Sequence, residues 1–152
     1  MPLRWRRWRR AWKSKAWTSS ATIHRNGRRA ASARSSLSRA GKTIYLAGVG
    51  AEDENAPAGA SAPVRHLGNP YEQCRYAYDK IKRLLATHGA SLADAVKQVV
   101  YVTDVRFQAD VAKCRSEAYG DGPIPANTFL VINALAIPGM LLEIDVTAVV
   151  AK

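Results

Sequence analysis

Apolar and polar residues follow a regular order along residues 40–152. A run rich in β-forming residues, Thr43 to Gly48, predicts a first strand. Beyond residue 69, apolar side chains recur at three- and four-residue steps, which is the spacing of a helix face. Asn69 is a good N-cap, Pro70 suits the first helical position, and Gly89 suits the position after the last turn. The pattern therefore predicts a long helix between Pro70 and Gly89.

The second half of the chain predicts three more strands and another helix. Ala95–Thr103 is a strongly apolar strand, and Asp104 is placed to cap a helix that ends near Tyr119. Thr128–Leu135 is a third strand. In Leu141–Val150 the even positions are all apolar and the odd positions include acids, so one face is core and the other polar. This order predicts an α+β fold: a mixed β-sheet with two helices on one face.

The charge of the chain is divided very unevenly. The 152 residues carry a formal net charge of +11, from 23 Lys and Arg against 12 Asp and Glu. Residues 1–40 hold 12 of those basic residues and no acid, so residues 41–152 hold 11 bases and 12 acids and are nearly neutral. We therefore expect a basic extension at residues 1–39 and one domain at residues 40–152. No run of 18 apolar residues predicts a transmembrane helix.

The extension is rich in tryptophan and arginine and allows several interpretations. Its tryptophans, at 5, 8, 12 and 17, alternate with arginine and lysine, so it suits an anionic membrane surface or a nucleic acid. Its acid-free, Ser-rich composition is also that of a transit peptide. Residues 18–39 show little periodicity, which predicts disorder. The favoured interpretation is an extension without function, or a translation start assigned upstream of the true one. We therefore base no function on residues 1–39.

Most motifs of catalysis and metal binding are missing from the chain. Cys74 and Cys114 fall on the apolar stripes of the two predicted helices, so we expect both to be buried packing residues and not nucleophiles. Two cysteines without a CxxC motif also predict neither a disulfide scaffold nor a thiolate zinc site. The histidines at 24, 66 and 88 have no partner at the spacing of metal ligands, so no metal is expected. Phosphate-binding and hydrolase signatures are absent from the sequence as well.

Several stretches of residues 38–150 follow one another in the order found in one family. These are Gly41-Lys42-Thr43-Ile44-Tyr45-Leu46-Ala47-Gly48, Gly89-Ala90-Ser91-Leu92-Ala93-Asp94-Ala95-Val96-Lys97, Val100-Tyr101-Val102-Thr103-Asp104, Pro125-Ala126 and Leu142-Glu143-Ile144. In this order they resemble the RidA family, also called the YjgF/YER057c/UK114 family. The resemblance implies a chorismate-mutase-like subunit and a cytoplasmic homotrimer, with ligand clefts between neighbouring subunits.

The resemblance also implies an activity. Typical members hydrolyse reactive enamines and imines, such as 2-aminoacrylate, to a 2-keto acid and ammonia, and they need no metal or organic cofactor. Such chemistry requires a cation for the substrate carboxylate, ideally the fork of an arginine. It also requires a carboxylate that positions water and moves protons. The implied partners are a small carboxylate ligand and further copies of the chain, with no nucleic acid or membrane at the domain itself.

The family positions map onto named residues of this sequence. The family glutamate of the last strand matches Glu143, the expected catalytic residue. The family arginine matches Asn127, which donates hydrogen bonds but brings no charge. Asn127 and the following Thr128 are expected to bind substrate. Ala47 stands where the family has a serine, and Tyr119, next to a loop, is placed to line the rim of a cleft.

These residues leave three functions open. The first is an enamine or imine hydrolase that uses Glu143. The second is a trimer that binds a small molecule without turnover, which the missing arginine at 127 favours. The third is action on RNA, because some relatives have been called endoribonucleases or translation inhibitors; the near-neutral domain disfavours it.

Overall fold

The computed structural model of this chain describes residues 41–57 and 61–151. The basic extension predicted at residues 1–39, with its membrane, nucleic-acid and targeting alternatives, lies outside this part of the chain. Within the described ranges, no helix is both long and apolar enough to cross a membrane.

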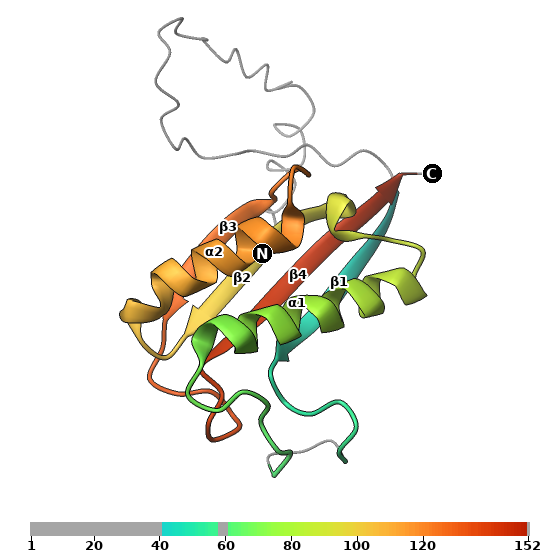
Figure 1. Cartoon of the computed structure of the whole chain (residues 1–152). Helices are drawn as coiled ribbons and strands as arrows, with labels where there is room; N and C mark the ends of the chain where they lie inside the picture. The colour runs from blue at the N-terminus through green and yellow to red at the C-terminus, as the bar shows by residue number, and fades with distance from the viewer. Residues whose placement is uncertain (1–40, 58–60, 152) are drawn as a thin grey trace, which may run out of the picture. The chain divides into compact units, whose positions relative to one another are not determined.

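The described elements follow the predicted order. They are β1 (Gly41–Gly50), α1 (Pro70–Thr87), β2 (Ala95–Val102), α2 (Gln108–Tyr119), β3 (Ala126–Val131) and β4 (Leu142–Ala151), with short 3₁₀ helices η1 (Leu92–Asp94) and η2 (Val105–Phe107). The strands form one sheet in the order β1-β4-β2-β3, in which β2 and β3 are parallel and the other pairs antiparallel. Both α-helices lie against the same face of this sheet (Figure 1). The predicted α+β fold is confirmed.

The first helix has the boundaries that its capping residues predict. The side chain of Asn69 accepts a hydrogen bond from the backbone N–H of Glu72 at 3.1 Å, and Pro70 occupies the first turn. Gly89, two residues beyond the end of α1, has a φ of 72°, a left-handed conformation that glycine adopts without strain. Local capping chemistry therefore fixes α1.

Two other elements have different boundaries from those predicted. Asp104 does act as a cap, but it caps η2, where its carboxylate accepts a hydrogen bond from the Arg106 N–H at 2.8 Å. The α-helix begins only at Gln108. The third strand begins at Ala126, earlier than predicted, and ends at Val131, because its parallel pairing with β2 runs from Lys97↔Ala126 to Val102↔Val131. Its limits depend on a partner strand that local sequence does not specify.

The core lies between the helices and the sheet. The even positions of β4 contribute four buried side chains to it, each at most 1% exposed: Leu142, Ile144, Val146 and Ala148. The odd positions from 143 to 149 remain partly exposed. The predicted alternation of core and polar faces along β4 is confirmed.

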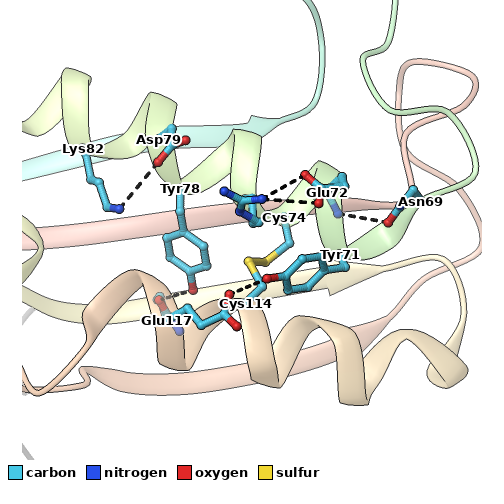
Figure 2. Close-up of a disulfide and its surroundings, with 11 residues drawn as sticks. Asn69, Tyr71, Glu72, Cys74, Tyr78, Asp79, Lys82, Cys114 and Glu117 are labelled. Carbon is cyan, nitrogen blue, oxygen red and sulfur yellow. Dashed lines mark hydrogen bonds and ion pairs between the residues drawn. A yellow bond between two sulfur atoms is a disulfide. The ribbon is translucent and has the colours of Figure 1, made fainter.

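A disulfide joins the two helices. Cys74 of α1 and Cys114 of α2 are both buried, as predicted, and their Cα atoms lie 6.2 Å apart (Figure 2). The expectation that they serve as free packing residues is wrong, because the packing of α1 on α2 brings together positions 40 residues apart in sequence.

Candidate functional site

The sheet face away from the helices carries the polar residues of β4. On this face, called the open face below, Glu143 pairs with Gly50 of β1 on one side and with Tyr101 of β2 on the other. The Tyr101 hydroxyl donates a hydrogen bond to the Asp145 carboxylate at 3.1 Å. Of the two acids of β4, Asp145 thus has a partner on the neighbouring strand.

The side chain of Glu143 lies directly over β1. A Cβ atom placed on Gly48 would come within 1.9 Å of Glu143 Oε1, so only glycine leaves room for this carboxylate. The pairing of β1 with β4 changes register between Leu46 and Val49, which makes Ala47 and Gly48 an irregular segment of the strand. The structure therefore brings the predicted residue Ala47, which is exposed, next to the glycine beneath Glu143.

The electrostatic surroundings of Glu143 favour its protonated form. Burial raises the pKa of this half-buried carboxyl group, and the negative charges of Asp145 and Glu52 raise it further. Within residues 41–57 and 61–151, the Glu143 side chain makes no hydrogen bond or ion pair. A carboxylate with a raised pKa and no bonded partner suits a group that exchanges protons with a ligand or water.

Lys80 holds the segment that carries Glu52. This buried lysine of α1 donates to the backbone oxygens of Gly50 at 3.2 Å and Glu52 at 3.0 Å, and its Nζ forms an ion pair with the Glu52 carboxylate. The end of β1 is thereby tied to α1. This tie fixes one of the charges that act on Glu143.

Thr128 also lies on the open face, but on the edge strand β3. It pairs with Val99 of β2, and its hydroxyl accepts a hydrogen bond from Lys97 Nζ. Because β2 separates β3 from β4, Thr128 is not adjacent to Glu143 within one subunit. These two predicted site residues therefore share a face but not a contact.

Asn127 and Tyr119 lie on the helix-covered face instead. Gln98 of β2, which is fully buried, donates through Nε2 to Asn127 Oδ1 at 2.9 Å. Its Oε1 accepts from the hydroxyls of Tyr119 at 3.0 Å and Tyr78 at 3.2 Å. Burial raises the pKa of both phenols. Tyr119 is only 7% exposed, so in this subunit it belongs to the core and not to a cleft rim.

Sequence reasoning missed Gln98, the centre of this network. A glutamine on the apolar face of the strand, in line with Val100 and Val102, is the signal that pointed to it. The strand register changes between Ala95 and Lys97, and beyond this point Gln98 shares the buried face with Val100 and Val102. Alternation with Val100 and Val102 places Gln98 on the buried face, but the partners that satisfy its amide come from the two helices and from β3, which local sequence does not specify.

A groove of about 390 Å³ lies elsewhere, between α1 and α2 above the disulfide. Charged residues of both signs line it, among them Arg75, Asp79, Lys82 and Glu117. The Tyr71 hydroxyl donates a hydrogen bond to the Glu117 carboxylate at 2.5 Å. This pair lies beside the disulfide (Figure 2). None of the predicted site residues lines this groove, and no group of three or more metal-binding side chains occurs in the described part of the chain.

The fold is a four-stranded mixed sheet with two helices on one face, and its open face carries a carboxylate without a bonded partner in the described chain. The family model described as Endoribonuclease L-PSP matches residues 27–150. The chain therefore belongs to this family, which is the RidA or YjgF/YER057c/UK114 family, as the sequence resemblance predicts.

Solved structures agree with this assignment. A YjgF/YER057c/UK114 family member from Mycobacterium tuberculosis is 29% identical, with a TM-score of 0.58 over 74% of this chain and 82% of its own. A Rid-family protein of unknown function from Yersinia pestis is 27% identical, with a TM-score of 0.61 over 72% and 80%. RidA from the Antarctic bacterium Psychrobacter sp. is 25% identical, with a TM-score of 0.63 over 80% and 91%.

Proposed function

We propose that this protein forms a homotrimer that hydrolyses small enamine or imine carboxylates to a keto acid and ammonia, with Glu143 as the catalytic residue. The observation that carries the proposal is the state of Glu143: half-buried, without a bonded partner in the described chain, and with a raised pKa at the family's glutamate position. The choice of chemistry rests on the resemblance of the motif order to the RidA family.

Two of the predicted site residues, Glu143 and Asn127, lie on opposite faces of the sheet, which supports a site shared between subunits. Glu143 lies on the open face, whereas Asn127 bonds to Gln98 on the covered face. One small ligand cannot contact both side chains within a subunit, because the sheet lies between them. A cleft that uses both must combine Glu143 of one protomer with β3 of another.

Exposed apolar side chains support association through the open face. Tyr45, which pairs with Thr147 across this face, is 79% exposed, and Leu130, which pairs with Tyr101, is 43% exposed. Covering such side chains removes apolar surface from water, which favours assembly. Closed symmetric assembly buries the same surface on each copy.

The proposed reaction replaces a C=N bond by a C=O bond. An enamine first takes a proton from solvent on carbon and becomes its iminium ion. Water then attacks the imine carbon while the Glu143 carboxylate accepts a proton from it, which gives a carbinolamine. Glu143 returns that proton to the nitrogen, and the C–N bond breaks so that ammonia leaves with the bonding electrons. The hydroxyl proton passes back to the Glu143 carboxylate as the C=O bond of the keto acid forms, and from there to solvent. The raised pKa suits both steps, because the group must accept and then donate a proton.

A second candidate function is ligand binding without turnover. Asn127 favours it, because a carboxamide offers no charge where the family resemblance implies an arginine. In that case the cleft and the trimer remain, and only the hydrolysis is missing. The proposed enzyme and this binding module differ in a single measurable product, ammonia.

The test measures ammonia release from imino acids generated in situ by an amino acid oxidase with catalase. We expect the wild-type chain to accelerate release, and Glu143→Gln to lower the rate by about 100-fold or more while the fold is kept. The matched control is Glu54→Gln, which removes an exposed carboxylate paired with Arg83, and its rate should equal that of the wild type.

Three results would overturn the proposal. Ammonia release at the background rate, with ligand binding retained, leaves the binding module. A lone protomer in light scattering removes the shared cleft. RNA cleavage that is lost in Glu143→Gln, without ammonia release, would replace the proposal by the ribonuclease for which the family model is named.

A further inference from the structure

The groove between α1 and α2 leads to one of the two cysteines of the disulfide. Cys114 is among the residues that line this groove of about 390 Å³, whereas Cys74 is not. Both cysteines are otherwise buried, since Cys74 is 0% and Cys114 is 1% exposed. A cavity of this size accommodates a small organic molecule. The groove therefore brings such a molecule next to Cys114 and not next to Cys74.

A small residue lines the groove on the same helix as Cys114. Ala118 lies four residues after Cys114, so both residues are on one side of α2. Tyr71 and Tyr78 of α1 line the groove as well, and Figure 2 shows them beside the disulfide. Because the methyl group of Ala118 takes up little space, a larger side chain at this position would fill the groove next to Cys114.

The groove opens to solvent on the side of the domain that carries the helices. Its lining includes the exposed side chains of Arg75, Lys82 and Glu117. The two helices form the layer opposite the open face of the sheet (Figure 1). The proposed association of copies uses the open face, so it leaves this groove accessible to a dissolved molecule.

Without the disulfide, α1 and α2 would be joined by noncovalent contacts only. At the groove these are the hydrogen bond from the Tyr71 hydroxyl to Glu117 and the Lys113 ammonium group, which lies 4.7 Å from the centre of the Tyr71 ring. Contacts of exposed charged groups contribute little to stability in water. The edge-to-face packing of Tyr78 on Tyr119 belongs to the core and would remain. The redox state of the cysteines therefore decides whether the two helices are clamped or only packed.

We propose that Cys114 Sγ is a thiol-exchange site, at which a small dithiol that enters the groove reduces the disulfide of the folded protein. One thiolate of the dithiol bonds to Cys114 Sγ, the bond from Cys114 to Cys74 breaks, and its electron pair leaves on Cys74 Sγ. The second thiolate attacks the dithiol sulfur that is bound to Cys114, which releases Cys114 as a thiolate. Each released cysteine takes up a proton, the protein gains two electrons, and the dithiol becomes a cyclic disulfide. This redox-sensitive clamp goes beyond the proposed hydrolase and does not depend on it.

The first test compares the reaction of two single-cysteine variants with dithiodipyridine. Cys74→Ser leaves the thiol at 114, in the lining of the groove, and Cys114→Ser leaves the thiol at 74, outside that lining. In the native protein we expect the thiol at 114 to react at least about 10-fold faster, because exchange requires access to the sulfur. In concentrated urea the two rates should be equal. Circular dichroism checks that both variants are folded without urea.

The second test follows reduction of the wild-type disulfide by excess dithiothreitol, with the free thiols trapped and counted by mass. Reduction through the groove should proceed at nearly the same rate in buffer and in about 1 M urea, whereas reduction that requires global unfolding accelerates by about 5-fold or more over that range. Ala118→Phe fills the groove and should slow reduction at least about 10-fold. The matched control is Ala112→Phe, an exposed position of the same helix outside the groove, which should leave the rate unchanged.

Three results would overturn the exchange site. They are equal rates for the thiols at 74 and 114, wild-type reduction that accelerates in step with unfolding, and two free thiols before any reductant is added. If a single-cysteine variant does not fold, the urea dependence of the wild type and the comparison of Ala118→Phe with Ala112→Phe decide. None of these measurements involves an imine or ammonia, so failure of the exchange site and failure of the proposed hydrolase are distinguishable.

Discussion

The two faces of the sheet differ in whether their central polar side chain, Gln98 on one and Glu143 on the other, has a hydrogen-bond partner. On the covered face, Gln98 binds Tyr78, Tyr119 and Asn127, so each of these side chains has a hydrogen-bond partner inside the domain. On the open face, Glu143 has no side-chain partner in the described chain, although Tyr101 and Asp145 beside it bond to each other. Both faces come from the same strands, so the helices and not the strand residues alone make the difference.

This contrast indicates where function and stability reside. Polar groups that bond to one another within a core contribute to a specific structure, and losing one leaves its partners unsatisfied. A carboxylate without a partner contributes little to stability and remains free for a ligand. The covered face should therefore respond to substitution mainly in stability, and the open face mainly in activity.

Removing the disulfide should have the largest effect on stability. The bond joins positions 40 residues apart, and a cross-link of this span restricts the unfolded chain by about 2–4 kcal/mol. We expect the double variant Cys74→Ala/Cys114→Ala to lose about that free energy of unfolding in urea, whereas exposed Ser116→Ala should change it by less than about 0.5 kcal/mol. Thiol titration of the unfolded, unreduced protein should find no free cysteine. Two free thiols would show that no disulfide joins α1 to α2.

Gln98→Leu should have a smaller effect that is still clear. The change leaves the buried Tyr78 and Tyr119 hydroxyls without their acceptor, which should lower the free energy of unfolding by about 1–3 kcal/mol. Adding Tyr119→Phe should recover part of the loss, because it removes one of the unsatisfied hydroxyls. The exposed Gln108→Leu is the matched control. Equal stability of Gln98→Leu and the wild type in urea would mean that the covered face does not depend on its polar network.

The smallest effect should be the pH dependence contributed by Glu143. Its pKa is raised in the folded state, so the folded protein holds this proton more tightly than the unfolded chain does. The wild type therefore loses stability as the pH rises from the ordinary glutamate pKa through the raised value, and Glu143→Gln does not. Urea titrations at several pH values should show the variant gaining slightly at neutral pH and matching the wild type in acid; a gain equal at every pH would contradict the assigned cause.

Local sequence was sufficient where local chemistry defines the element. Asn69, Pro70 and Gly89 mark the ends of α1 through capping and backbone conformation, which depend on neighbouring residues only. The alternation of β4 identified both its buried and its polar face for the same reason. The resemblance in motif order likewise predicted the family, which the family model confirms.

Tertiary structure decided everything that joins distant residues. The pairing of Cys74 with Cys114 needs two helices packed side by side, and the limits of β3 come from its pairing with β2. The opposite orientation of Asn127 and Glu143 follows from sheet register, so their separation is invisible in a sequence motif that names both. Side-chain spacing along a chain encodes the face of one element, whereas contacts between elements arise only when the whole core is packed.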